Sequence, residues 1–463
     1  MLGTAIAQLS VASSLALGVP VAGWAVDHLV GAALATQHEF GTIGSGATEL
    51  VSGPTLDVAT RHDMQARRFR SQARRAQRET RYYAQLFEDL AVDPGQLTYD
   101  SIASLPCTPK AAIQEAPGNF VSRRKRPAWI ASSSGSTGRP VSVAFSEHEL
   151  HIFASLSALG FLMSNDLHPD DVVYLAAGSG IATYTLERVC RRVGVEALPG
   201  GHLPVHEILR QLTAAQRKPT VLHAPPSLLG ALIETGRSLG YGPRNFNLEC
   251  ILTGGEILTC GLRDRLKAVF SEAKLIESYG MTETFGVGGQ VCASGHLHFH
   301  PAHGLIEVID PDTHGPVSSN RIGTLIVTPL PPFRDTTLLL RYDTQDLVRV
   351  IAEPPTCELR WLPAVSRVLG KRSLSIRHEN GWTFPRDVLE ALEAIEDIPL
   401  PARCGIWQRD DGVGVEVVAR SVSAVTHRRV TDALEARAIP VRELHVVTDQ
   451  TELRHALPLR HAA

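Results

Sequence analysis

The chain has 463 residues, of which 44% are hydrophobic and 20% charged, and its formal net charge at pH 7 is −3. These are the values of an ordinary globular protein, and the near-neutral charge gives no support for a polyanionic or a strongly acidic partner. Seven cysteines without a CxxC pair argue against a disulfide framework and favour a reducing cytoplasm. At this length we expect one large domain and one smaller domain.

The N-terminal segment is unusual because its first 26 residues carry no charged side chain. That length is enough to span a membrane, but the Ser and Thr residues and Pro20 within it lower its hydrophobicity. A secretory signal or an oriented anchor needs Lys or Arg nearby, and the first such residue is Arg61. We therefore expect residues 1–55 to be an N-terminal extension that ends in a Gly/Ser/Thr-rich linker over 40–54; a membrane anchor or signal is the alternative.

A basic helix is predicted over residues 60–90. Met64, Phe69, Ala73 and Tyr82 can form an apolar stripe, which would leave the arginines on a solvated face. A nucleic-acid interface is the alternative, but no constellation of basic and aromatic residues elsewhere supports it. The arginines concerned are Arg61, Arg67, Arg68, Arg70, Arg74, Arg75, Arg78 and Arg81.

Strand-like and helix-like segments alternate from Trp129 to about Val269, which indicates a mainly parallel sheet flanked by helices. Further on, short apolar runs predict a second sheet or a small barrel. The pattern restarts after residue 369 as strand, turn and helix. The expected strands are 172–177, 220–224, 249–253, 305–309, 323–328, 338–342 and 373–377, and the expected helices are 186–193, 227–239 and 386–395.

We therefore predict an α/β fold. A large multi-sheet domain with parallel sheets flanked by helices and a small barrel-like part occupies 56–369. A small α+β C-terminal domain occupies 370–463.

The strongest local signal for chemistry is the segment 131–140, Ala-Ser-Ser-Ser-Gly-Ser-Thr-Gly-Arg-Pro. Its glycines allow a bulky anion to approach the backbone, and its hydroxyl groups can donate hydrogen bonds to phosphate oxygens. It is not the GxxxxGK[ST] loop, because no lysine follows the second glycine. A flexible linker is the alternative, but strand-like sequence on both sides disfavours it. The predicted phosphate-binding residues are Ser133, Ser134, Gly135, Ser136, Thr137 and Gly138.

Three further segments each offer a group suited to ATP. Glu283 can hold Mg²⁺ through the oxygen ligands that this ion prefers. Tyr279 offers a ring on which adenine can stack, and Asp346 can accept hydrogen bonds from ribose hydroxyls. Separately, each has an ordinary alternative: a solvated glutamate, a core tyrosine or a turn aspartate. The segments are 253–256 (Thr-Gly-Gly-Glu), 277–284 (Glu-Ser-Tyr-Gly-Met-Thr-Glu-Thr) and 341–347 (Arg-Tyr-Asp-Thr-Gln-Asp-Leu).

In this order the four segments resemble the adenylate-forming superfamily of acyl-CoA synthetases, and most closely its phenylacetate–CoA ligase branch. The branch is indicated by 341–347, by Leu297-His298 ahead of 305–311, and by Arg81-Tyr82-Tyr83. The likeness covers roughly Thr60 to the end. It implies an ATP- and Mg²⁺-dependent ligase that activates a carboxylic acid as an acyl-AMP, and a C-terminal domain that swings between adenylation and transfer.

The resemblance also implies site residues, position by position. Thr282 and Glu283 would meet phosphate and Mg²⁺ as catalytic residues, and Lys371 falls where the family usually has an arginine beside the ribose. Besides Ser133–Gly138, the implied ATP-binding residues are Gly254, Gly255, Glu256, Ser278, Tyr279, Gly280, Asp346 and Lys371.

The chain departs from the family in its C-terminal region. The family normally supplies a late lysine that contacts the acid and the α-phosphate, whereas here no lysine follows Lys371. Losing one preorganised charge typically costs ~10²–10³ in rate, and an arginine restores the charge but not the compact geometry of a lysine. Slow adenylation, use of Arg454 or Arg460, and an unusual acid all stay open.

Two other departures concern the loop before the ribose aspartate and the acceptor. Gln345 replaces the usual glycine, and 377–381 lacks the Arg-Gly step that helps form the channel for coenzyme A. The acceptor is therefore open between the thiol of coenzyme A, an amine, and a nucleophile such as nitrite that meets an activated aryl amine. A degenerate homologue that binds nucleotide without turnover is a further alternative.

Some members of this branch carry a cysteine/histidine zinc site, and Cys292, His298 and Cys357 stand at matching places. Pro355 replaces one ligand, which leaves three of the four that zinc prefers. The candidates for the fourth ligand are His296, His300 and His303. Two buried cysteines beside surface histidines are the alternative.

The acid pocket of the family is expected at Tyr174, Ala177, Gly178, His223 and Pro225. Small side chains there leave room for a ring, and the scarcity of charge favours an aryl or apolar acid, although His223 can equally be a packing residue. The expected partners are therefore a small-molecule acid and an acceptor, with neither nucleic acid nor membrane. A homodimer stays open.

Overall fold

The computed structural model describes residues 2–43, 57–133, 139–214, 217–270, 272–352, 355–379 and 381–458. Most of the predicted linker over 40–54 lies outside these ranges. So do Ser134, Gly135, Ser136, Thr137 and Gly138 of the predicted phosphate loop, and Arg460.

The largest sheet has eight strands in the order β13-β9-β8-β7-β6-β5-β3-β4. The strands from β7 to β4 run parallel, and β8, β9 and β13 extend the sheet in antiparallel fashion. The carboxyl ends of the parallel strands therefore share one edge, where open α/β sheets bind ligands. The strands are β3 (Val172–Leu175), β4 (Glu196–Pro199), β5 (Val221–His223), β6 (Cys250–Gly254), β7 (Lys274–Tyr279), β8 (Gly289–Val291), β9 (His296–Phe299) and β13 (Ala364–Ser366).

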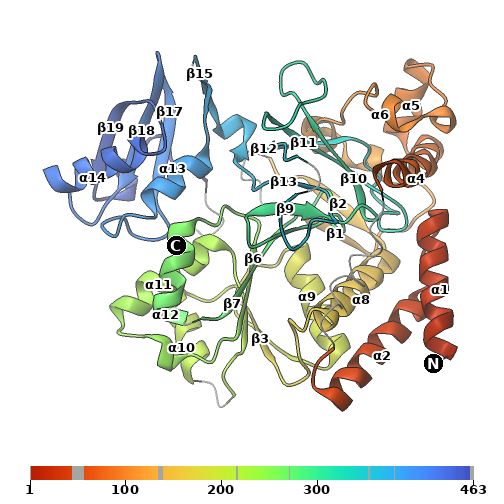
Figure 1. The fold of residues 1–463 in the computed structure, drawn as a ribbon, viewed down its shortest axis with the longest axis horizontal. Coiled ribbons are helices and arrows are strands. Elements are labelled where there is room, and N and C mark those ends of the chain that lie inside the picture. The colour runs from red at the N-terminus through yellow and green to blue at the C-terminus, as the bar shows by residue number, and fades with distance from the viewer. Residues whose placement is uncertain are drawn as a thin grey trace.

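Helices cover both faces of the parallel part of this sheet (Figure 1). Val173 and Leu175 pack with α8 and α9, whereas Tyr174 between them packs with α10, α11 and α12. Because side chains alternate along a strand, the continuous apolar run of β3 is buried on both faces, as expected for a parallel strand. The predicted α/β fold is confirmed. The helices are α8 (Glu147–Met163), α9 (Ile181–Val193), α10 (Val205–Ala214), α11 (Pro226–Ser238) and α12 (Cys260–Phe270).

The N-terminal segment forms two helices, α1 (Leu2–Leu17) and α2 (Gly23–Phe40), which lie beside α8 in Figure 1. Val30 of α2 is buried in the apolar cluster that contains α8 and α9. The carboxylate of Asp27 accepts a hydrogen bond from the Ser155 hydroxyl at 3.1 Å. Across the described part of the chain, no helix has both the length and the apolar character needed to cross a membrane.

The basic stretch forms two helices rather than one, α4 (Val58–Glu79) and α5 (Arg81–Asp89). Thr80 separates them with extended backbone, and its hydroxyl accepts a hydrogen bond from the Tyr83 amide at 3.3 Å. Threonine is a favoured residue at a helix N-terminus for this reason. The prediction of one continuous helix over 60–90 was therefore wrong at its centre.

Arg68 also departs from the prediction that the arginines of this stretch are solvated. It is 1% exposed, next to the buried Phe69, and its Nε donates to the Pro331 carbonyl at 3.1 Å. Burial lowers the pKa of Arg68 to about 10. The prediction failed here because the carbonyl of a distant loop turns inward and needs a donor.

The second sheet is antiparallel with the order β10-β11-β12-β14. The predicted strand over 338–342 was wrong: residues 338–340 are buried in an irregular segment that joins a large apolar cluster, and strand pairing starts only at Tyr342. Burial rather than pairing explains this apolar run. The strands are β10 (Gly304–Ile309), β11 (Ile322–Pro329), β12 (Tyr342–Arg349) and β14 (Gly370–Lys371).

The C-terminal elements lie together at one end of the molecule, blue in Figure 1, around their own apolar cluster. The strand predicted over 373–377 begins later than expected, because residues 372–374 form a 3₁₀ turn that closes with the Ser375 hydroxyl donating to the Lys371 carbonyl at 2.9 Å. The boundary at 369–370 stays a prediction. The elements are β15 (Ile376–His378), β16 (Gly381–Thr383), α13 (Pro385–Leu392), β17 (Cys404–Arg409), β18 (Gly412–Val418), α14 (Ala424–Glu435) and β19 (Val441–Val447).

Candidate active site

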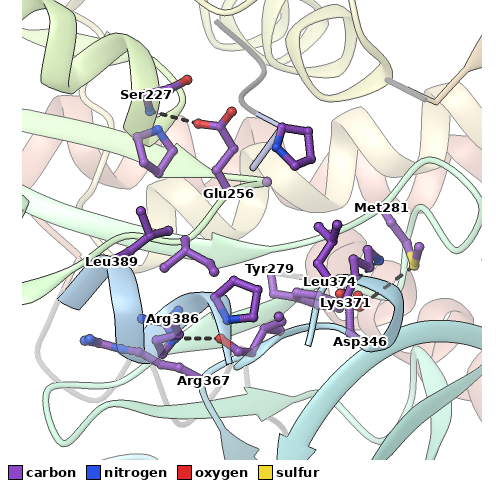
Figure 2. Close-up of a pocket in the computed structure, with 18 of the residues that line it drawn as sticks. Ser227, Glu256, Tyr279, Met281, Asp346, Arg367, Lys371, Leu374, Arg386 and Leu389 are labelled. Atoms are coloured by element: carbon purple, nitrogen blue, oxygen red, sulfur yellow. Dashed lines mark hydrogen bonds and ion pairs between the residues drawn. The ribbon is translucent and has the colours of Figure 1, made fainter. Parts of the chain in front are cut away.

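A cavity of about 220 Å³ lies where the carboxyl ends of β6 and β7 meet β12, β14 and α13. Figure 2 shows side chains from these elements around it. The cavity gathers most of the described residues predicted to bind ATP, although they come from distant parts of the sequence. These residues are Ser133, Gly255, Glu256, Ser278, Tyr279, Gly280, Thr282, Glu283, Asp346 and Lys371.

Asp346 is held by two side chains in the cavity wall. The Tyr279 hydroxyl donates a hydrogen bond to Asp346 Oδ2 at 2.7 Å, and the Lys371 amine lies 2.9 Å from Asp346 Oδ1 (Figure 2). The Lys371 amine also donates a hydrogen bond to the Thr344 carbonyl at 2.9 Å. Burial, followed by the charge of Asp346, raises the pKa of Tyr279. A carboxylate offers about four acceptor positions, so Asp346 is fixed in orientation and retains capacity for a ligand.

A bulge in β12 aims Asp346 at the cavity. Between the pairs Asp343–Ile326 and Leu347–Thr324, the register of β12 shifts against β11. Gln345 in this bulge has φ +62°, in the left-handed region, which costs a residue with a Cβ atom roughly 1–2 kcal/mol. Glycine adopts this conformation freely. Gln345 therefore stands at a position whose backbone conformation favours glycine, the residue that the family usually has there.

Glu283 presents a buried carboxylate to the same cavity. It is 2% exposed, and its Oε1 accepts a hydrogen bond from the Tyr342 hydroxyl at 3.2 Å. Burial, then the charge of Glu283, raises the pKa of Tyr342. A carboxylate oxygen is a ligand type that Mg²⁺ prefers, so Glu283 fits a magnesium ion, with the Thr282 side chain beside it in the cavity wall.

The two glycines at the end of β6 allow the chain to turn at the cavity. A Cβ on Gly254 would lie 2.3 Å from the Ser278 carbonyl oxygen, and Gly255 has φ +79°. The turn carries Glu256, whose Oε2 accepts from the Ser227 amide at 2.8 Å (Figure 2). Glu256 therefore receives an amide at the start of α11, where a negative charge is favourable.

The described end of the predicted phosphate loop reaches the cavity. The Ser133 amide donates to the Val141 carbonyl, and the Ser133 hydroxyl accepts from the Val141 amide, both at 2.9 Å. This pairing extends the hairpin of β1 (Trp129–Ser132) and β2 (Ser142–Phe145). The rest of the predicted loop lies outside the described residues, so its phosphate contacts stay a prediction.

The predicted acid-pocket residues do not line this cavity. The Tyr174 hydroxyl instead donates to Gln211 Oε1 at 2.8 Å. His223 ends β5 at the ligand-binding edge of the sheet, and burial lowers its pKa to about 4. Ala177, Gly178 and Pro225 follow the ends of β3 and β5. Their role in binding the acid stays a prediction.

Lys110 is a cavity residue that sequence analysis missed. It is the first residue of α7 (Lys110–Glu115), is 9% exposed, and lines the cavity with Glu283 and Asp346. Burial lowers the pKa of Lys110, while the charges of Glu283 and Asp346 act in the opposite direction. The sequence around Lys110 contains no pattern that we could link to catalysis, so no local signal marked it.

A second polar group lies on the far side of β9 from the cavity. One ligand atom from each of Cys292, His296, His298 and Cys357 lies within 4.8 Å of the others. His298 Nδ1 lies 3.2 Å from the Leu362 carbonyl and its Nε2 lies 3.2 Å from Cys357 Sγ. A histidine ring held by a carbonyl in this way is typical of a metal ligand.

His296 completes this group, whereas the other two candidate histidines lie elsewhere. The rings of His300 and His303 stack with centroids 4.6 Å apart, and His303 packs against Phe333. His296 Nδ1 is buried and has no hydrogen-bond partner within the described part of the chain. Four cysteine and histidine ligands at this spacing fit a tetrahedral zinc ion.

Comparisons with known proteins bear on the family and the fold of the chain. The profile of the AMP-binding enzyme family matches residues 96–328. The phenylacetate-coenzyme A ligase of Thermus thermophilus is 30% identical over 328 residues, which span 68% of this chain and 72% of the Thermus protein. A solved 2-hydroxyisobutyryl-CoA ligase in the postadenylation state has a TM-score of 0.73 at 18% identity, and the match covers 88% of this chain and 90% of that one. ATP-bound MatB from Rhodopseudomonas palustris has a TM-score of 0.53 at 19% identity, and the match covers 70% of this chain and 64% of MatB.

Proposed function

The chain belongs to the AMP-binding enzyme family and is an adenylate-forming ligase, and from this premise we propose that it joins an aryl or apolar carboxylic acid to coenzyme A through an acyl-AMP. The observation that carries the proposal is the meeting of Tyr279, Glu283 and Asp346 in one cavity. The name of the Thermus relative supports both an aryl acid and coenzyme A. The small uncharged residues after β3 agree with an aryl or apolar acid.

In the proposed first half-reaction, a carboxylate oxygen of the acid attacks the α-phosphorus of ATP. The bond from this phosphorus to the bridging oxygen breaks, and pyrophosphate leaves with the electron pair. Asp346, oriented by Tyr279 and Lys371, would accept the ribose hydroxyls. Thr282 would contact the phosphates, and Glu283 would hold Mg²⁺, which when bound neutralises phosphate charge.

In the proposed second half-reaction, the thiolate of coenzyme A attacks the acyl carbon, and AMP leaves with the electron pair of the broken carbon–oxygen bond. The 377–381 region departs from the pattern that forms the coenzyme A channel in the family. Arg377 there forms an ion pair with Asp312, and its guanidinium lies 5.7 Å from the centre of the Trp382 ring. The acceptor therefore needs a direct experiment.

The mass of the product tests the proposal. The protein is incubated with ATP, Mg²⁺ and a panel of aryl acids, and coenzyme A, a primary amine and nitrite are supplied in parallel. We expect an acyl-CoA thioester, together with AMP and pyrophosphate in equal amounts. An amide, or a product containing nitrite-derived nitrogen, would replace coenzyme A as the acceptor. Release of ADP, or absence of any acid-dependent product, would contradict the proposed ligase.

We also propose that Cys292, His296, His298 and Cys357 bind one structural zinc ion. The support is the compact ligand set and the unpartnered His296 Nδ1. Protein purified without added metal is expected to contain one zinc ion per chain, measured by mass spectrometry of the metal. His296→Ala should lose most of the zinc, whereas His300→Ala, outside the group, should retain it. Equal zinc content in both variants would contradict this site.

A further inference from the structure

The N-terminal helix α1 holds one face against its own chain and turns the other face to solvent. Ala7 and Ser14, which are seven residues apart, are both buried. Val11 between them packs with a small apolar cluster that contains Val26 of α2 and Ile152 of α8. Residues at these spacings share one side of a helix, so this side of α1 is fixed to the body of the protein.

The opposite side of α1 is apolar and exposed. Leu2 is 78% exposed, Ile6 49% and Leu9 68%, and Ala5 and Ala12 are exposed as well. Of the thirteen large apolar side chains that are exposed in the described part of the chain, seven belong to the first 40 residues. Helix α1 lies at the edge of the molecule (Figure 1). Apolar side chains gathered on an exposed face are typical of an interaction site.

The spacing of these exposed residues is that of a helix packed against another helix. Leu2 and Leu9 are seven residues apart, and so are Ala5 and Ala12, with steps of three and four residues between them. This is the a and d pattern of helices that pack along their length. The buried Ala7 falls at the f position, on the side away from this seam. The surface that fits the exposed side of α1 is therefore a second helix.

The exposed side of α1 is complementary to itself when two copies of the helix run antiparallel. If Ala5 of one copy faces Leu9 of the other, then Leu2 faces Ala12, because facing positions run in opposite directions. Every leucine of the seam then faces an alanine, and a large side chain opposite a small one lets the two helices interdigitate. This arrangement has two-fold symmetry, the commonest symmetry of homo-oligomers.

Charge separates a second copy of the chain from a lipid surface as the occupant. Residues 1–26 carry no charged side chain, and the first Lys or Arg is Arg61. The charged side chains of α1 and α2 are the carboxylates of Asp27 and Glu39, beside two histidines. A helix that lies on a membrane is usually rich in Lys and Arg on its polar face, and anionic headgroups repel carboxylates. An uncharged helix, in contrast, can pair with its own copy without repulsion.

We propose that Leu2, Ala5, Leu9 and Ala12 form a dimer interface, in which α1 packs antiparallel against α1 of a second copy of this chain. The 16 residues of α1 make a helix about 24 Å long. This is short for a stable interface, so the dimer is expected to dissociate on dilution. Because α1 precedes residues 96–328, which match the AMP-binding family, the interface adds to the ligase without entering its chemistry.

Analytical ultracentrifugation of the full chain tests the interface. Wild-type protein should pass from monomer to dimer between about 1 and 100 μM. Leu9→Glu should raise the dissociation constant of the dimer at least about a hundredfold, because it places a charge without a partner in the seam. Leu239→Glu, which changes an exposed leucine outside the N-terminal segment, should dimerise like wild type. Both positions are exposed, and circular dichroism with the melting temperature checks that the variants are folded.

A pair of opposite charges tests the antiparallel register. Ala5→Lys alone should weaken the dimer, as Leu9→Glu does. The variant that combines Ala5→Lys with Leu9→Glu should bind about tenfold more tightly than Leu9→Glu alone, because opposite charges then face each other twice in the dimer. Combining Ala5→Lys with Leu2→Glu introduces the same two charges at positions that do not face each other, and should give no recovery.

Wild-type protein that stays monomeric at about 100 μM would overturn the proposal. So would a dimer that Leu9→Glu leaves intact, one that Leu239→Glu weakens equally, or a pair of facing charges that brings no recovery. Flotation with vesicles of phosphatidylcholine, alone and mixed with phosphatidylserine, tests the lipid surface. Vesicle binding that Leu9→Glu abolishes, by a protein that does not dimerise, would replace the second copy with lipid. None of these measurements depends on enzymatic activity.

Discussion

Two polar groups lie on opposite sides of one strand, and they are built for different tasks. Leu297 of β9 lines the cavity of the candidate active site, whereas its neighbours His296 and His298 join the cysteine/histidine group on the other face, as the alternation of side chains along a strand requires. The cavity group surrounds open space, whereas the atoms of the cysteine/histidine group already lie close to one another. An open arrangement suits catalysis and a closed one suits a structural metal.

This comparison predicts opposite mutational behaviour. Changes in the cavity group should alter rates or nucleotide affinity and leave the fold stable. Changes in the cysteine/histidine group should lower stability and leave the rate of adenylation nearly unaltered. Each prediction below tests one side of this division.

The largest effect is expected for Glu283→Gln. The change removes a carboxylate charge proposed to hold Mg²⁺ but keeps the shape of the side chain, so adenylation should fall by ~10³-fold or more. The melting temperature should change little. Acid-dependent pyrophosphate release measures the effect, and Glu272→Gln, an exposed glutamate, is the matched control. Wild-type turnover in Glu283→Gln would remove Glu283 from the site.

Cys292→Ser should act mainly on stability. Losing one thiolate ligand of the proposed zinc ion should weaken its binding at least a hundredfold, which would lower the free energy of unfolding by roughly 3 kcal/mol. Urea unfolding measures this change, with Cys260→Ser, an exposed cysteine outside the group, as control. A large loss of adenylation rate with unchanged stability would reverse our assignment of the two groups.

Tyr279→Phe should produce a smaller effect on nucleotide affinity. The ring remains, but the hydrogen bond to Asp346 is lost, and hydrogen bonds to charged groups contribute about 1.5–3 kcal/mol. We expect KM for ATP to rise at least tenfold while kcat changes less. Tyr241→Phe, outside the cavity, serves as control. A fall in kcat at unchanged KM would argue against a purely positioning role for the hydroxyl.

The smallest predicted effect is a gain in stability for Gln345→Gly. Relief of the left-handed backbone at φ +62° should outweigh the entropy cost of glycine and raise the free energy of unfolding by about 0.5–1 kcal/mol. Gln290→Gly, on the regular strand β8, should instead lower stability. A loss of stability in Gln345→Gly would mean that the glutamine side chain makes a compensating contact.

The sequence predicted the parallel sheet well, because this sheet follows from a local pattern of apolar runs. It also named most of the described residues that line the cavity, and their roles in binding ATP stay predictions. It misplaced the strand over 338–342, since an apolar run alone does not separate a buried strand from a buried irregular segment. It also left three histidines as candidates for the fourth metal ligand, and their placement in the fold selects His296.

Lys110 shows most clearly what local reading misses. It comes to the cavity only because Thr108 pairs with the start of β12, a contact between segments far apart in sequence. Its residue type and neighbours are ordinary for an exposed helix start. Arg68 is a parallel case, because its burial depends on a carbonyl of a distant loop.

The central claim is that the cavity binds one magnesium-bound ATP and activates an acid on it. Exchange of labelled pyrophosphate into ATP tests this most directly, because it requires a reversible acyl-AMP but no acceptor. We predict exchange that depends on both Mg²⁺ and an aryl or apolar acid and that disappears in Glu283→Gln. A folded protein that gives no exchange with any acid of the panel would contradict the account.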